Sequence, residues 1–354
     1  MDDTEIIDLA TRTLEAIADD LQASYGEDGR LDLRWIPTLE VNAHARSLSH
    51  QDQPPIHEIA VTYGLAIALY KNIEDVFIFI DANQADLSEK QLGLRPLKEF
   101  FGNSKISNLT RNSYLSALTW VFFHELGHLK QGHLNITHPN LFHQFSESYS
   151  LSENNLATDQ SALSHCLELA ADFFATMHVS DELLRHFFKE PPELEKAIAS
   201  FFIGVSVAIY TFTDIDFEAI PQHPEGSHPP PILRLEMMLP RAVEYFSYLK
   251  VLNGYTKEKY YDLVYLCTLN ANVCAHIRWH IQEGEESPSL NINENLSATP
   301  PHLRPNGKSY LRDIIQVLDE IRPILVSNMS NSYHKDSTYV LSITKAYREI
   351  VFED

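Results

Sequence analysis

One apolar stretch of the chain carries polar groups that normally stay in water, and it limits how the chain can fold. Residues 115–129 form a mostly apolar, proline-free run that predicts a buried helix, and positions 124–128 read His-Glu-Leu-Gly-His. Because residues four apart lie one above the other on a helix, His124 and His128 face the same point. Buried polar groups are costly without partners, so the fold must bring further polar side chains to this helix.

Two neutral imidazoles on one face of a helix can hold a zinc ion. Glu125 is one position further round the helix, where it can reach a water molecule at the metal without binding the metal itself, as a general base requires. The same pattern also arises by chance in a chain with 17 histidines, and the buried setting of this helix is what favours a metal site. The sequence therefore predicts zinc at His124 and His128.

A catalytic zinc usually has three protein ligands and one open position. The extended pattern that supplies a third histidine requires His at position 134, where the sequence has leucine. His133 is about half a turn round the helix from His124, so we expect it to point away from the metal. The third ligand must then come from another part of the chain.

A second apolar helix, expected at 161–178, offers carboxylates instead. Glu168 and Asp172 are four residues apart on one face, among apolar neighbours where unpaired carboxylates would be costly. We expect Glu168 to bind the zinc and Asp172 to accept a hydrogen bond from the far nitrogen of a ligand histidine. The alternative is an ordinary amphipathic helix with a solvated acidic edge.

Composition argues against several kinds of partner. The chain has 354 residues, 44% hydrophobic and 21% charged, which is enough for a sizeable core, and its formal net charge is -22. Such a surface repels nucleic acid and anionic membranes, so neither is expected as a partner.

The acidic start of the chain shows no secretory signal, and three scattered cysteines make no disulfide framework, which favours a cytoplasmic protein. The sequence indicates no oligomeric state.

One charge-free stretch, residues 197–212, raises the question of a membrane span. It is slightly shorter than the roughly 20 residues that cross a bilayer, and serine, glycine and threonine interrupt it. We therefore interpret it as a buried core helix rather than a span.

Periodicity predicts an α+β protein that is mainly helical, with a small N-terminal sheet beside the helix of 115–129. Further elements are expected along the N-terminal part of the chain: a helix at 4–23, one or two strands in 31–45 broken at Pro37, a strand at 57–63, a helix from Gly64 and a short buried strand at 76–80. We divide the chain into an N-terminal helix (1–30), a core (31–240) and a helical C-terminal region (241–354). The core contains an insertion at 82–110 and a polar loop or lid at 134–160.

Several stretches resemble one group of metallopeptidases, in the same order along the chain. His-Glu-Leu-Gly-His at 124–128, followed by Glu-Leu-Ala-Ala-Asp at 168–172, is similar to the Glu-zincins, in particular the HtpX and CAAX-prenyl-protease branch. Residues 227–235 resemble the His-Pro-x-x-x-x-Arg segment of that branch, and 41–45 with 59–65 resemble its first strands. Cytosolic proteins with similar motifs are the Lit phage-exclusion peptidases and the ImmA/IrrE regulators.

The resemblance implies a zincin-like core and a zinc endopeptidase that cleaves an intracellular protein or peptide. In this chemistry Glu125 takes the proton from water and passes it to the leaving amine, and His228 and Arg234 donate to the oxyanion. A turn histidine and a structural arginine are the alternatives for the last two. A rival function is a zinc-containing protein-binding or regulatory module without turnover, in a bacterial defence or stress-response system. Glu125 argues against it, because a scaffold needs no carboxylate between its ligands.

In the resembling group the strand that corresponds to residues 58–63 borders the cleft. Its open edge would pair with an extended substrate, so Ile59, Val61 and Tyr63 are expected to hold the substrate backbone. The alternative is that this strand is interior. Selectivity would then come from residues 82–110, the stretch 134–160 and the C-terminal helices.

Overall fold

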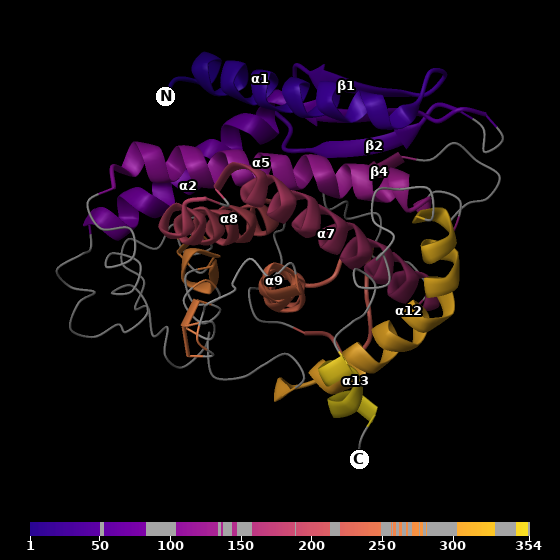
Figure 1. Cartoon of the computed structure of the whole chain (residues 1–354). Helices are drawn as coiled ribbons and strands as arrows, with labels where there is room; N and C mark the ends of the chain where they lie inside the picture. Colours follow the sequence, from indigo (N-terminus) through magenta and orange to yellow (C-terminus); the bar gives the residue numbers. More distant parts are fainter. Residues whose placement is uncertain are drawn as a thin grey trace.

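In the computed structural model a small sheet lies on one side of a layer of helices (Figure 1). This arrangement confirms the mainly helical α+β class that the sequence predicts. The structure describes residues 1–49, 53–82, 104–133, 136, 144–146, 158–187, 189–212, 220–248, 303–329 and 345–352, with a few residues between 256 and 281.

The sheet has four strands in the order β1-β3-β2-β4. They are β1 (Arg30–Ile36), β2 (Ala43–Ser47), β3 (Ile56–Thr62) and β4 (Gln144–Ser146). β3 is parallel to β1 and antiparallel to β2, and β4 is antiparallel to β2. The sequence predicted one or two strands in 31–45 and one at 57–63, and β1, β2 and β3 lie there. β4 falls in the stretch 134–160 expected as a loop or lid, most of which lies outside the described residues.

β3 has a neighbouring strand on both sides. Val61, for example, is in register with Trp35 of β1 and with Ala43 of β2. Both edges of the strand are therefore used within the sheet, and Tyr63 begins the next helix. The expectation that Ile59, Val61 and Tyr63 hold a substrate backbone at an open edge is wrong, because this strand has no open edge.

The chain begins with helix α1 (Asp3–Gln22), followed by the short 3-10 helix η1 (Ala23–Tyr25). Asp2 and Glu5 form a capping box: the Asp2 side chain accepts from the Glu5 N–H at 2.8 Å, and Glu5 accepts from the Asp2 N–H at 2.9 Å. The buried face of α1 belongs to the same hydrophobic core as the rest of the chain.

Helix α2 (Tyr63–Ala82) corrects one expectation. Residues 76–80 were expected as a buried strand, but they are the last turns of this helix. Seven buried apolar residues along α2 follow helical spacing, and this longer pattern decides the structure of the short apolar run: Leu65, Ala66, Leu69, Tyr70, Ile73, Val76 and Phe77. Ile78, by contrast, is 51% exposed.

Helix α5 (Ile106–Lys130) runs through the centre of the molecule, against α2, β2, α7 (Thr158–Phe187) and α8 (Pro191–Thr211) (Figure 1). Its second half is buried on all sides, as expected of a helix that is apolar all round. α5 begins inside the expected insertion 82–110, whose residues 83–103 lie outside the described part of the chain. The close packing of α5 on α8 depends on Gly204, where a Cβ atom would lie 2.1 Å from the Ser113 carbonyl oxygen.

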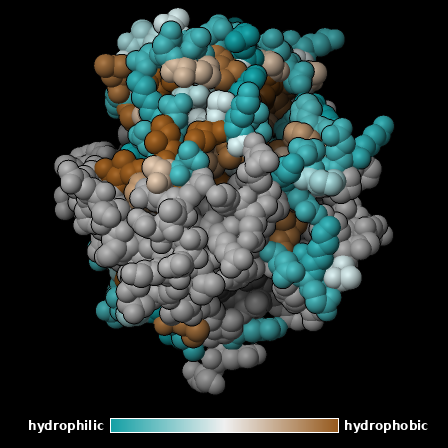
Figure 2. Space-filling view, turned by 90° about the vertical axis from the view of Figure 1, so that its left-hand side faces the viewer, coloured by the Kyte–Doolittle hydropathy of each residue, from teal (hydrophilic) through white to brown (hydrophobic). Residues whose placement is uncertain are grey.

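Helix α8 contains the charge-free stretch 197–212. Among the described residues it is the one helix long and apolar enough to cross a membrane, over Pro192–Thr211, but 78% of that window is buried inside the fold. The burial fits a core helix. Among the residues coloured by hydropathy in Figure 2, hydrophilic and hydrophobic side chains are mixed, and hydrophobic ones reach the surface in a few places.

Three more helices follow: α9 (Pro231–Tyr248), α12 (Gly307–Met329) and α13 (Lys345–Phe352). α9 and α12 both pack against α7, and α13 packs against α12. One hydrophobic core joins residues from all three expected parts of the chain, from Ile6 to Val351. The C-terminal region is therefore packed onto the helices of the core.

Candidate metal centre

Helices α5 and α7 pack closely against each other at a glycine. A Cβ atom placed on Gly127 would lie 3.2 Å from the Cα atom of Ala171 and 3.2 Å from Cδ1 of Phe174. These distances are shorter than an ordinary van der Waals contact, so a residue without a side chain lets the two backbones come together. Side chains of α5 near Gly127 therefore lie close to side chains of α7 near Ala171.

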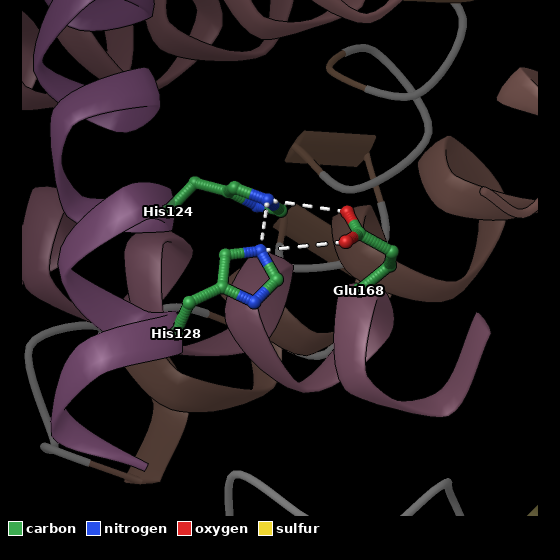
Figure 3. A group of neighbouring side chains, drawn as sticks. All are labelled: His124, His128 and Glu168. Carbon is green, nitrogen blue, oxygen red and sulfur yellow. Dashed lines mark hydrogen bonds and ion pairs between the residues drawn. The ribbon is translucent and has the colours of Figure 1, made fainter. Parts of the chain in front are cut away.

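Three buried side chains converge beside this contact (Figure 3). The Nε2 atoms of His124 and His128 are 3.0 Å apart, and the Glu168 carboxylate lies 3.3 Å from the first and 3.4 Å from the second. One ligand atom from each residue lies within 4.8 Å of the others, and all three side chains are buried. Two imidazoles and a carboxylate are donors that zinc and similar metal ions accept. This group can therefore hold a metal ion.

The protonation state of His128 suits metal binding. Burial lowers the pKa of this imidazole far below its ordinary value, and the neighbouring His124, His133 and His228 lower it further. A neutral imidazole keeps a lone pair on one ring nitrogen, and that lone pair is what binds a metal.

The opposite nitrogen of His124 faces Asp172. Nδ1 of His124 lies 2.9 Å from Oδ1 of Asp172, while Nε2 faces Glu168. A proton on Nδ1 leaves the Nε2 lone pair directed at the cluster. Burial alone would raise the pKa of Asp172, but the Arg234 charge and the hydrogen bonds from His124 and Arg234 outweigh it, so the pKa is lowered. Asp172 is therefore ionised and orients the His124 ring.

Arg234, at the start of α9, is the buried countercharge of Asp172. Its Nε donates to Oδ2 at 2.9 Å and its Nη2 donates to Oδ1 at 2.7 Å. This pairing gives Arg234 a structural part, because a fully buried carboxylate requires a paired charge and the guanidinium supplies it. The oxyanion role expected for Arg234 stays a prediction. The guanidinium also lies 5.7 Å from the centre of the Trp120 ring.

His133 contacts the cluster, contrary to expectation. The prediction assumed that the helix continues, but α5 ends at Lys130 and Gly132 has a φ of +67°, which turns the chain back. Nδ1 of His133 lies 2.8 Å from Nδ1 of His128. Burial lowers the pKa of His133 to about 3, so its ring is neutral and offers one donor and one acceptor. His133 thus faces the nitrogen of His128 that is turned away from Glu168.

His228 reaches the cluster from the segment before α9. Its Nε2 lies 3.5 Å from Oε2 of Glu168, and its Nδ1 lies 2.8 Å from Oγ of Ser227. The side chain is 6% exposed. The structure therefore brings a third histidine to the same carboxylate, as the oxyanion role predicted for it requires, although that role stays a prediction.

Glu125 lies on α5 between the two histidines of the cluster and is 1% exposed. Each residue turns about 100° round a helix, so its side chain leaves the helix beside the point that His124 and His128 face. Its role as general base also stays a prediction.

Two residues that hold the His228 segment were not singled out from the sequence. Ser164 and His165 lie one turn before Glu168 on α7, and both contact residues 225–227. Their spacing from Glu168 was the only sign available, since i and i+4 share a helix face. Nothing in the sequence related them to a segment about sixty residues later.

A buried pair of histidines four apart on one helix, completed by a carboxylate from another, is a ligand set of metal-dependent hydrolases. Residues 94–243 match the model of the family Peptidase U49, a range that contains every residue of the cluster. The family match and the cluster together fit a metallopeptidase. No curated protein and no solved structure matches the chain.

Proposed function

We propose that the protein is a zinc-dependent endopeptidase of the Glu-zincin type that cleaves an intracellular protein or peptide in the cytoplasm. The observation that carries the proposal is the buried His124–His128–Glu168 cluster, with Glu125 between its histidines, inside a range that matches a peptidase family. A carboxylate at that position suits hydrolysis better than a scaffold, because only hydrolysis needs a base there.

His124, His128 and Glu168 would hold the metal. When bound, zinc supplies a Lewis acid that polarises the scissile carbonyl and lowers the pKa of nearby water. Two neighbouring residues orient the ligand histidines through their Nδ1 atoms, which point away from Glu168. Asp172 contacts Nδ1 of His124, and His133 contacts Nδ1 of His128.

Two residues handle protons and charge. Glu125 accepts the proton of the attacking water and delivers it to the leaving amine. His228 donates from Nε2 to the oxyanion that forms, while its Nδ1 accepts from the Ser227 hydroxyl 2.8 Å away. Arg234 acts indirectly: it keeps Asp172 ionised, and Asp172 in turn orients His124.

Metal content tests the ligand set. We expect about one zinc per chain after purification without chelators, and loss of this zinc in His128→Ala. His57→Gln is the matched control: His57 is also a buried histidine, but it lies on β3 and its Nδ1 is 3.0 Å from the Tyr25 hydroxyl. Zinc that stays in His128→Ala, or that leaves in His57→Gln as well, would contradict the assignment.

Cleavage tests the reaction. Wild type and Glu125→Gln are incubated with a cell lysate, and new protein N-termini are compared. We expect cleavage by the wild type and a loss of about 10²-fold or more in the variant, with zinc retained. Glu58→Gln, the same change at a buried carboxylate of β3, should cleave as wild type does. Zinc without any cleavage by the wild type would favour the binding module instead.

A further inference from the structure

We infer that Tyr310, on the C-terminal helix α12, is a positioning residue that fixes His228 by way of His165. The inference rests on the proposed function and gives α12 a part in it, although α12 lies outside the residues that match the peptidase family. The connection runs from Tyr310 to His165 on α7, and from His165 to the turn at 225–228.

The turn that carries His228 is hydrogen-bonded to two side chains of α7. Ser164 Oγ donates to the Ser227 carbonyl oxygen at 2.8 Å, and Nε2 of His165 lies 3.1 Å from the Glu225 carbonyl oxygen. Between these two carbonyls, Gly226 has a φ of +77°, which glycine tolerates best. The position of His228 therefore depends on two side chains located one turn before Glu168.

Tyr310 determines how His165 can act. His165 is fully buried, and burial lowers its pKa to about 3, so the ring is neutral and carries one proton. A carbonyl oxygen only accepts, so that proton must be on Nε2, facing Glu225. Nδ1 is then an acceptor, and the Tyr310 hydroxyl in contact with it must be the donor. The hydrogen bonds thus run in one direction, from Tyr310 through His165 to Glu225.

Helix α12 and the residue that precedes it, Asn306, make two further contacts with the segment. Asp313 Oδ2 lies 2.7 Å from Nδ1 of His223, and Nδ2 of Asn306 donates to the Ile220 carbonyl oxygen at 3.2 Å. The first of these contacts is exposed and the second is half-buried, whereas Tyr310 is fully buried. Because exposed polar pairs contribute little, the buried link is the one expected to set the position of the turn.

Loss of the Tyr310 hydroxyl would leave Nδ1 of His165 a buried acceptor without its donor. Such a group is costly, and the ring can relieve the cost by changing tautomer or orientation. Either change removes the donor from the Glu225 carbonyl, so the turn loosens and His228 is no longer held 3.5 Å from Glu168. The zinc ligands keep their own contacts.

The first experiment does not depend on activity. Hydrogen exchange at the backbone amides of residues 225–228 is measured in the metal-free protein, for wild type and Tyr310→Phe. We expect exchange about 10-fold faster in the variant. Tyr114→Phe is the matched control, because Tyr114 is an equally buried tyrosine whose hydroxyl has no hydrogen-bond partner among the described residues. Exchange at 225–228 that is unchanged in Tyr310→Phe, or equally raised in Tyr114→Phe, would overturn the inference.

The second experiment uses turnover. Tyr310→Phe should lower kcat about 10-fold while KM and zinc content stay as in wild type. In a His228→Ala background the same change should cost less than about 2-fold, because Tyr310 acts through His228. An equal loss in both backgrounds would show a purely structural role. If the wild type cleaves nothing, the proposed function fails, and the exchange measurement alone decides the positioning. His165→Leu, which cuts the same link at its middle, serves if Tyr310→Phe does not fold.

Discussion

The buried ion pair of Arg234 and Asp172 gives the sharpest test of how the metal-binding helices are held. Arg234→Met removes the guanidinium and keeps an apolar side chain of similar length. Asp172 then stays in the core with its charge and without two hydrogen bonds, of 2.9 and 2.7 Å. His124 still faces Oδ1 at 2.9 Å, which offsets part of the loss.

Breaking one side of a buried ion pair typically costs about 3–5 kcal/mol, and the remaining His124 contact favours the lower end, about 3 kcal/mol. Asp172→Asn should cost a similar amount, because it leaves the Arg234 charge buried. The double variant contains no unpaired charge, so its cost should be about 2–3 kcal/mol less than the sum of the two single costs.

The assay is urea unfolding of the four proteins at pH 7 with a chelator present, so that bound metal does not contribute to the free energy of unfolding. Arg185→Met is the control: its pairs with Glu182 and Asp20 are largely exposed, and we expect a change below about 1 kcal/mol. Single costs that simply add, to within about 0.5 kcal/mol, would refute the reasoning.

Two further predictions follow from the packing of α5 and of the sheet. Gly127→Ala puts a Cβ atom 3.2 Å from Ala171 and should separate α5 from α7 by a few tenths of an ångström, weakening zinc binding about 10-fold by titration; unchanged affinity would contradict this. Burial lowers the pKa of His57 to about 4, so the unfolded chain takes up this proton near pH 6.5 and the folded chain does not. His57 alone should therefore lower the free energy of unfolding by about 3 kcal/mol between pH 6.5 and 4, so His57→Gln should lose about that much less than wild type over this range; parallel curves would argue against it.

Regular spacing explains what could be predicted from the sequence. His124 with His128, and Glu168 with Asp172, are pairs at i and i+4, so each pair shares a helix face before any tertiary contact is known. Alternation likewise indicated one or two strands in 31–45, where β1 and β2 lie. These patterns depend on local backbone geometry, so a few neighbouring residues are enough to reveal them.

Contacts between distant segments have no such pattern. Arg234 meets Asp172 from 62 positions away, and Tyr310 meets His165 from 145 positions away. His133 lies beside the cluster because Gly132 adopts a left-handed conformation. The neighbouring residues give no sign of this conformation in the sequence. Alternation also shows which residues of a strand face inward but not which strand lies beside it, so the central place of β3 could not be predicted.

The place of β3 between β1 and β2 bears on how the chain is made. A ribosome releases residues 30–47 before residues 56–62, so the two earlier strands emerge without the strand that joins them. The last strand, at 144–146, follows only after the whole of α5 has been synthesised. Unpaired strand edges invite pairing with other chains, and the edge of β2 that pairs with β4 stays open in the nascent chain until residues 144–146 have been made. Chaperone binding to the early part of the chain would cover this edge until β4 arrives.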